Sequence, residues 1–215
     1  MLIKTHTTTE PIVKEGWKYL FVSLIVFFIT LFFNFLPWVG FFIVLATLYI
    51  FRNPERIPAE DDKLALLSPM DGQITDISKV RFKNGEEFLK VEIQKRALDT
   101  SLLRSPISLN IKKSRRIHGL FLESKSPLQK KLGERAILQC QGEYADIVMI
   151  IYAGMLNTKL ELFKSVGPLR LASRFGFLLD GSIELLLPVD TRIKVSLQSS
   201  VKAGESVLGY FPYKN

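Results

Sequence analysis

The feature that most constrains this chain is a run of 33 residues without a charged side chain, from Tyr19 to Phe51. The run is dense in Phe, Leu, Ile and Val, which is the composition of membrane segments. One straight helix of this length would be roughly 50 Å long, whereas the hydrocarbon core of a bilayer is about 30 Å thick. A single crossing helix therefore fits poorly.

Three residues in the middle of the run account for its length. Asn34, Pro37 and Gly40 divide it into two apolar halves, and Pro37 removes a helical hydrogen bond at the division. Each half has about 15 residues and would span about 22 Å as a helix. We therefore predict a hydrophobic helical hairpin over residues 19–51, at or in the membrane, which dips into the bilayer or barely crosses it.

The flanks of the hairpin predict its orientation. Lys14 and Lys18 precede it, Arg52 and Arg56 follow it, and Trp38 suits a membrane interface. Basic residues at both outer ends place both ends on the cytoplasmic side of the cell membrane. A cleaved signal peptide is a poor alternative, because the run is too long and lacks a small-residue cleavage site. A buried helix pair of a soluble protein is the other alternative, although uncharged runs this long are rare in soluble cores.

The rest of the chain divides by composition. Residues 1–18 are predicted to form a polar N-terminal arm, and residues 52–63 a linker with two prolines and a cluster of acidic side chains. From residue 64 to residue 215, short apolar runs alternate with glycine-containing turns. This alternation indicates a mainly β domain.

Individual elements of this domain can be predicted from its apolar runs. The expected strands are Gln73–Val80, Phe88–Ile93, Ile147–Tyr152, Leu169–Ala172, Ser182–Leu187 and Arg192–Leu197, and the expected helical turns are Thr100–Leu103 and Leu128–Leu132. The segment Val201–Gly209 resembles the strand-turn-strand hairpin of lipoyl and biotinyl domains. We therefore expect a barrel-sandwich-like core.

The balance of charge indicates an anionic partner. The chain has 29 basic and 21 acidic residues, a formal net charge of +8, which suits phospholipid headgroups or nucleic acid. Many of the basic residues lie in one segment, which contains Lys112, Lys113, Arg115, Arg116, Lys125, Lys130 and Lys131. This segment is either a solvated face or a contact for anionic lipid. Nucleic acid is disfavoured, because aromatic residues are concentrated in the hydrophobic run rather than among these basic residues.

Cysteine usage and the known binding motifs exclude several kinds of site. The single cysteine, Cys140, excludes an internal disulfide and a multi-cysteine zinc site, and we expect it to be a small buried hydrophobic residue. The sequence contains no P-loop, dinucleotide fingerprint or set of zinc ligands. We therefore expect no metal.

The pair Gly181-Ser182 lies between two strongly apolar runs near the C-terminus. A glycine before a serine at a strand junction can adopt dihedral angles that other residues do not tolerate, which exposes its carbonyl to the neighbouring hydroxyl. Attack by Ser182 Oγ would convert the amide to an ester, whose elimination and hydrolysis would leave a pyruvoyl group, an electron sink. The alternative is a Gly-Ser β-turn or bulge without chemistry.

A second motif, Ser68-Pro69-Met70-Asp71-Gly72, predicts a turn that leads into a strand. The structural interpretation is the turn alone. The functional interpretation makes Asp71 a carboxylate that orients a proton-transfer partner or polarises a nucleophile.

Six short motifs follow one another along the chain: Phe51–Arg56, Ser68–Gly72, Leu98–Pro106, Gly133–Arg135, Tyr152–Gly154, and Arg174-Phe175-Gly176 followed by Gly181-Ser182. In this order, and behind a hydrophobic segment, they resemble the phosphatidylserine decarboxylase family in its short, membrane-anchored form. The family's counterparts are Phe-Arg-Asp-Pro-x-Arg, Ser-Pro-x-Asp-Gly, Leu-Asp-Val-His-Val-Asn-Arg-x-Pro, Asn-Glu-Arg, Ile-Ala-Gly, and Arg-x-Gly with Gly-Ser. The resemblance extends from about Trp17 to Tyr210.

The resemblance implies a proenzyme that cleaves itself between Gly181 and Ser182 and converts Ser182 into a pyruvoyl cofactor, with Asp71 assisting. A Schiff base between this ketone and the serine amine of phosphatidylserine would then permit decarboxylation to phosphatidylethanolamine. The candidate substrate-binding residues are Ser101, Arg104 and His118. The expected partners are an anionic phospholipid membrane and a phospholipid substrate, and the protein would be a homo-oligomer or a heterodimer of its cleaved chains.

The chain departs from the family pattern at several positions. Ser101 stands where the family carries the His expected to be the general acid and base, and the other histidines are His6 in the arm and His118. Gly133 replaces the Asn of Asn-Glu-Arg, and Asn157-Thr158-Lys159-Leu160 replaces Ala-Arg-Arg-Ile. These departures leave a second interpretation open. The chain would then be a non-catalytic relative that acts as a membrane-bound module for lipid or partner binding.

Overall fold

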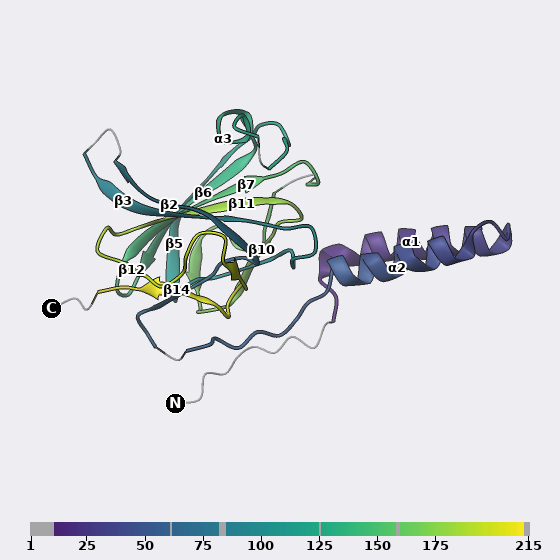
Figure 1. Cartoon of the computed structure of the whole chain (residues 1–215), viewed down its shortest axis with the longest axis horizontal. Coiled ribbons are helices and arrows are strands. Elements are labelled where there is room, and N and C mark those ends of the chain that lie inside the picture. Colours follow the sequence, from purple (N-terminus) through teal and green to yellow (C-terminus); the bar gives the residue numbers. More distant parts are fainter. Residues whose placement is uncertain (1–10, 61, 82–84, 125, 158–159, 213–215) are drawn as a thin grey trace. The chain divides into compact units, whose positions relative to one another are not determined.

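The computed structural model describes residues 11–60, 62–81, 85–124, 126–157 and 160–212. The chain divides between Glu55 and Arg56 into two compact units. The first unit is helical and the second is built mainly of strands (Figure 1). Mainly β structure behind an N-terminal hydrophobic helical segment confirms the predicted fold class.

The helical unit contains the predicted hairpin. A short 3₁₀ helix, η1 (Lys14–Gly16), leads into α1 (Trp17–Phe32), and α2 (Pro37–Ile50) follows after a tight turn. The turn is left-handed at Asn34 and Leu36, with φ angles of 48° and 47°. Pro37 opens α2, a position where its fixed φ suits a helix and its missing N–H is not needed.

Glycine and small polar residues let the two helices pack closely. A Cβ atom on Gly40 of α2 would overlap Thr30 of α1, so the absence of a side chain permits this approach. Most of the large apolar side chains of α1 and α2 are exposed. Among the described residues, the helical stretch Lys14–Phe32 is the one long and apolar enough to cross a membrane, whereas Pro37–Ile50 is shorter.

The second unit is organised around an eight-stranded antiparallel sheet (Figure 1). In spatial order its strands are β13 (Ser200–Val201), β2 (Gly72–Arg81), β3 (Glu87–Gln94), β11 (Gly181–Leu187), β7 (Asp146–Ala153), β6 (Arg135–Gly142), β5 (Leu109–Ile117) and β9 (Gly167–Leu169). Strand β11 is central and pairs with β3 on one edge and β7 on the other.

Two three-stranded sheets and one helical turn complete this unit. One sheet has the order β1 (Ala65–Leu67), β14 (Val207–Tyr210) and β12 (Arg192–Ile193), and the other has the order β4 (Leu102–Arg104), β10 (Arg174–Phe177) and β8 (Glu161–Leu162). The short helix α3 (Gln129–Leu132) precedes β6.

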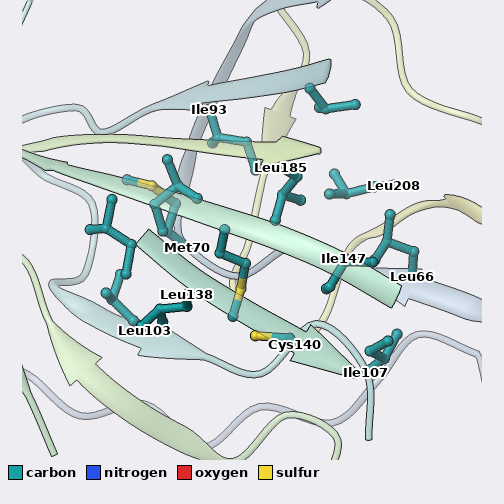
Figure 2. Packing of buried hydrophobic residues seen from close by; sticks show 14 of the residues in the cluster. Leu66, Met70, Ile93, Leu103, Ile107, Leu138, Cys140, Ile147, Leu185 and Leu208 are labelled. Atoms are coloured by element: carbon teal, nitrogen blue, oxygen red, sulfur yellow. The ribbon is translucent and has the colours of Figure 1, made fainter. Parts of the chain in front are cut away.

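The hydrophobic core lies on one face of the large sheet (Figure 2). Because successive strand residues point to opposite faces, Ile183, Leu185 and Leu187 of β11 enter the core together. Side chains of the smaller sheets, such as Leu66 and Leu103, belong to the same cluster, which gives a sandwich-like arrangement. The expectation for Cys140 is confirmed: it is buried, and burial raises the pKa of its thiol to about 12.

Four predicted strands and one helical turn are confirmed. The strands lie within β2, β3, β7 and β11, and the turn is α3. Three predictions are wrong in whole or in part. Thr100–Leu103 contains no helix, because Leu102–Arg104 pairs with β10; Leu169–Ala172 is strand only at Leu169; and the strand expected over Arg192–Leu197 ends at Ile193.

The predicted hairpin over Val201–Gly209 is also wrong. Its two strands flank a turn as expected, but β13 pairs with β2 and β14 pairs with β1 and β12. Sequence analysis also missed β5 and β6, since charged and polar side chains interrupt their apolar pattern. Most of the basic segment proves to be the exposed part of β5, and its Lys125 lies outside the described residues.

Candidate active site

Gly181, the first residue of β11, has a backbone conformation that favours glycine. Its φ angle is +146°, and a Cβ atom at this position would overlap the carbonyl oxygen of Tyr152 on β7. Both facts exclude a larger residue without a backbone shift. The special dihedral angles expected at the Gly-Ser pair are therefore present.

The carbonyl oxygen of Gly181 accepts two hydrogen bonds. The backbone N–H of Lys95 donates at 3.0 Å and the side-chain Nε2 of Gln94 donates at 3.1 Å. Both donors come from the C-terminal end of β3, the strand that pairs with β11. The position of the carbonyl is therefore fixed from one side by a backbone group and a side chain.

Ser182 is completely buried, and its hydroxyl has no hydrogen-bond partner within the part of the chain that the structure describes. Ile183 lies in the core, so Ser182 points to the opposite face of the sheet. Its partners across the two ladders are Gln94 and Tyr152, which share that face. An unpartnered buried hydroxyl costs about 1–3 kcal/mol.

Side chains hold the segment that precedes Gly181. Asn157 accepts a hydrogen bond from the Leu179 N–H at 2.9 Å and donates from Nδ2 to the carbonyls of Gly154 and Asp180. The Ser124 hydroxyl donates to the Asp180 carboxylate at 2.8 Å. Gly154 permits this packing, because a Cβ atom there would overlap both Asp180 and Ser124. At a position where the family pattern has Ala, the Asn157 side chain thus makes three hydrogen bonds that hold this segment.

Ser101 lies beside the same segment. Its carbonyl accepts a hydrogen bond from the Leu178 N–H at 2.8 Å, three residues before Gly181. Its side chain is also buried, and its hydroxyl has no partner among the described residues. Ser101, which stands where the family pattern has histidine, is therefore linked by a backbone hydrogen bond to the segment that leads into the Gly-Ser pair.

Asp71 is bound on both carboxylate oxygens. Oδ1 accepts from the Ala203 N–H at 2.7 Å, whereas Oδ2 accepts from Arg56 at 2.9 Å and from the Thr100 N–H at 3.3 Å. Arg56 also pairs with Glu205 at 3.0 Å. None of these bonds reaches the Ser182 hydroxyl. In the described residues, Asp71 therefore contacts the backbone next to Ser101 and makes no hydrogen bond to the Ser182 hydroxyl.

The other two candidate substrate-binding residues occupy different environments. Arg104 of β4 is buried, and its guanidinium donates to the Ala172 carbonyl at 3.1 Å. His118 is exposed, with Nδ1 3.6 Å from the Glu134 carboxylate. Its link to the Gly-Ser pair is indirect: the Glu134 carbonyl accepts from the Ala153 N–H, and Ala153 pairs with Gly181. His6, Thr158 and Lys159 lie outside the described residues.

Sequence analysis missed a polar layer on the Ser182 face of the sheet. Lys130 of α3 pairs with Glu92 at 2.6 Å and with Glu184 at 2.8 Å, and the Tyr152 hydroxyl donates to Glu184 at 3.1 Å. Burial, together with the charge of Glu184, raises the pKa of Tyr152. For Lys130, burial acts to lower the pKa, but hydrogen bonds to Glu184 and Glu92 outweigh it and the pKa is raised. A carboxylate at Glu184, inside an otherwise apolar strand, was the available signal.

No cluster of three or more His, Cys, Asp or Glu side chains that could hold a metal ion occurs in the described ranges. A prosthetic group made from residue 182 itself needs no such ligands. The arrangement places an unpartnered hydroxyl, that of Ser182, in the residue that follows a carbonyl held by two donors in the described part of the chain.

Comparison with known proteins gives the family. The model of the phosphatidylserine decarboxylase family matches residues 44–209. Proteins named phosphatidylserine decarboxylase proenzyme from Geotalea uraniireducens and Syntrophus aciditrophicus are 28% and 29% identical to this chain, and the matches cover 94% and 93% of it and 97% of each relative. The protein of that name from Desulfotalea psychrophila is 32% identical over 76% of this chain and 78% of its own length. The chain therefore belongs to the phosphatidylserine decarboxylase family.

Proposed function

We propose that this chain is the precursor of a phosphatidylserine decarboxylase and that it cleaves itself between Gly181 and Ser182. The observation that carries the proposal is the Ser182 hydroxyl, which is buried, adjacent to a held carbonyl and bonded to no acceptor in the described residues. Unsatisfied groups of this kind are rare in folded proteins and often belong to reactive sites. The relatives' name, proenzyme, agrees with a precursor that is processed.

The proposed cleavage needs no oxidant or reductant. Ser182 Oγ attacks the Gly181 carbonyl carbon, an ester C–O bond forms as the peptide C–N bond breaks, and the hydroxyl proton passes to the Ser182 nitrogen, which becomes an amine. Loss of the Ser182 Cα proton then breaks the Cβ–Oγ bond, which releases Gly181 as a carboxylate and leaves dehydroalanine. Water hydrolyses the imine tautomer of dehydroalanine, ammonia leaves, and a pyruvoyl group remains at position 182.

A pyruvoyl group fits position 182, because the site already encloses a small side chain and places Gln94 and Tyr152 on the same face. A ketone at this position accepts electrons from a bond that breaks in an amine substrate such as phosphatidylserine. The chain's own residues supply the frame. Asp71 fixes the Thr100–Ser101 backbone, and Asn157 fixes the segment before the cleaved bond.

The proposal includes the placement of the protein. Residues 19–51 anchor it in the cell membrane, residues 1–18 and 52–63 flank the anchor, and residues 64–215 form the decarboxylase domain on the cytoplasmic side. A bilayer-bound domain meets a lipid substrate without extracting it from the membrane. The exposed basic side chains of β5 suit contact with anionic headgroups.

A second function is favoured by one observation. Ser101 replaces the histidine of the family pattern, and within the described residues no histidine is hydrogen-bonded to the Ser182 hydroxyl. A chain that cannot transfer the required protons would be a membrane-bound module for lipid or partner binding. Cleavage and turnover must therefore be tested separately.

Two measurements test the proposal. Intact mass of the purified protein should give two chains that end at Gly181 and begin at residue 182, the second with a pyruvoyl group in place of an amino terminus. The matured protein in phospholipid vesicles should then release carbon dioxide from phosphatidylserine. An uncut chain after long incubation contradicts self-cleavage, whereas cleavage without carbon dioxide release favours the binding module.

A further inference from the structure

Two N–H groups converge on the oxygen of the bond that the proposed function breaks. The Lys95 backbone N–H lies 3.0 Å from the Gly181 oxygen, and Gln94 Nε2 lies 3.1 Å from it. The geometric mark of an oxyanion hole is a set of donors about 2.7–3.1 Å from the position that an oxygen will occupy once it becomes negatively charged. The Gly181 oxygen is such an atom, because attack by Ser182 Oγ turns the carbonyl into a tetrahedral oxyanion.

We propose that the Gln94 side-chain amide and the Lys95 backbone N–H form the oxyanion hole for self-cleavage, and that Gln94 is a catalytic residue of this step. The inference rests on the proposed function, which it deepens by assigning the group that stabilises the charge. In the step, the Ser182 Oγ–carbon bond forms and the carbonyl π electrons move to the oxygen. They return when the C–N bond breaks, so the two donors act only between these events.

The sheet fixes both donors before the reaction. Gln94 is the ladder partner of Ser182, so the amide and the attacking hydroxyl lie on the same face of the sheet. The next residue, Lys95, is buried, and its ammonium binds the carbonyls of Arg96 and Asp99 at 3.3 and 2.7 Å, which orders the turn that follows β3. Donors held in this way need no reorganisation as charge develops.

Strand pairing alone explains the Lys95 bond but not the Gln94 bond. A backbone N–H at the end of β3 extends the ladder whatever its side chain is. The Gln94 amide is an additional donor that pairing does not require. Nothing in the sequence marks this glutamine, because its partner becomes visible only when β3 and β11 are aligned.

The neighbouring strand provides a matched control. Gln73 of β2 is the ladder partner of Gln94, and its Nε2 donates to the Gln198 carbonyl at 2.8 Å. Gln73→Ala removes the same kind of bond from the same sheet without touching Gly181. A general effect of losing a glutamine hydrogen bond would appear in both variants.

The test measures the first-order rate of self-cleavage for the full chain by intact mass. Gln94→Ala should slow cleavage roughly 100-fold, since removal of one oxyanion-hole donor costs about this factor or more. Gln94→Glu keeps the shape but places a carboxylate against the oxyanion, so it should be slower still at neutral pH. Lowering the pH should partly restore its rate, because a protonated carboxyl donates again. A merely structural glutamine would not produce this pH dependence.

Each outcome decides the question. Equal rates for wild type, Gln94→Ala and Gln73→Ala overturn the inference and leave the proposed function standing. If the two alanine variants slow equally, Gln94 is structural and the inference is also overturned. Hydroxylamine, which cleaves an ester but not an amide, provides a second readout of the attack step. If the wild type neither cleaves nor yields a hydroxylamine product, the proposed function and the inference fail together.

Discussion

The two sides of the Gly181–Ser182 bond are held by different kinds of contact. On the C-terminal side, Ser182–Leu187 lies between β3 and β7, so its backbone is paired on both edges. On the N-terminal side, the Gly154 N–H donates to the Asp180 carbonyl, and the side chains of Asn157 and Ser124 add further hydrogen bonds to Leu179 and Asp180. The first side is held by the sheet, whereas the second depends partly on individual side chains.

This difference indicates which substitutions can change the rate of cleavage of the Gly181–Ser182 bond. Backbone pairing is insensitive to side-chain identity, so the strand side provides a rigid frame for Ser182. On the other side, the bonds from Asn157 and from Ser124 each come from a single side chain that one substitution can remove. Changes before the bond should therefore alter cleavage gradually, whereas changes at the bond itself should abolish cleavage or disrupt the fold.

The largest effect is expected for Ser182→Ala, which removes the nucleophile but leaves the pairing of β11 intact. Self-cleavage should be lost completely, while the fold is retained, because the lost hydroxyl had no partner among the described residues. Intact mass after long incubation measures the first result, and circular dichroism measures the second. Any cut between residues 181 and 182 in this variant would remove Ser182 from its proposed role.

Gly181→Ala tests the start of β11, where the chain is held by strand pairing. Because its Cβ would overlap the Tyr152 carbonyl at a φ of +146°, we expect the free energy of unfolding to fall by at least about 3 kcal/mol. The free energy of unfolding is measured by urea titration in the Ser182→Ala background, because this substitution should prevent cleavage and keep the protein as a single chain. Unfolding can be followed by thiol labelling, since burial raises the pKa of Cys140 to about 12 and should keep it unreactive in the folded state.

Gly85→Ala is the control for this substitution. Gly85 has a φ of 86°, and, apart from its neighbours in the chain, no atom of the described residues lies within 4 Å of a Cβ atom placed there. Its cost should be only about 1 kcal/mol, from the left-handed backbone alone. Equal losses at the two glycines would show that the close approach of Tyr152 has no energetic effect.

Asn157→Ala tests the N-terminal side of the Gly181–Ser182 bond. It removes one acceptor and two donor contacts from a buried side chain, so the free energy of unfolding should fall by about 2 kcal/mol. Self-cleavage should slow roughly tenfold, because the Gly181 carbonyl is less well positioned. Asn157→Asp keeps the acceptor for Leu179 and should retain part of the rate. An unchanged cleavage rate in Asn157→Ala would mean that β11 alone positions the bond.

Ser124→Ala should have the smallest effect. It removes one hydrogen bond to the Asp180 carboxylate, so a stability loss of about 1 kcal/mol and a cleavage rate within about threefold of wild type are expected. Measured beside Asn157→Ala under the same conditions, it ranks the two contacts. A larger loss of stability or cleavage rate in Ser124→Ala than in Asn157→Ala would mean that Ser124, not Asn157, provides the more important contact.

Part of the fold could be predicted because local pattern and tertiary structure agree. The apolar run that ends in Leu185–Leu187 and the break at Pro37 follow from neighbours in the chain. Thr100–Leu103 could not be predicted, because its strand exists only through pairing with β10. Likewise, the strands of Val201–Gly209 join different sheets for reasons that local sequence does not contain.

The candidate site divides in the same way. Gly181-Ser182 and Asp71 could be singled out from the sequence, because each lies in a short motif with its own chemistry. Gln94, Asn157 and Ser124 could not, because their roles depend on which backbone groups lie opposite them. Glu184 was visible as a charge in an apolar strand, but its partners Lys130 and Tyr152 were not.

The hydrophobic hairpin, the mainly β domain and the pair Gly181-Ser182 can be identified from the sequence, since each depends on residues close together in the chain. The surroundings of that pair, in contrast, follow from the tertiary structure. The antiparallel alignment of β11 with β3 brings Gln94 to the Gly181 carbonyl, although 87 positions separate the two residues. Contacts at such separation depend on strand register, which is set by burial of the whole sheet rather than by local sequence.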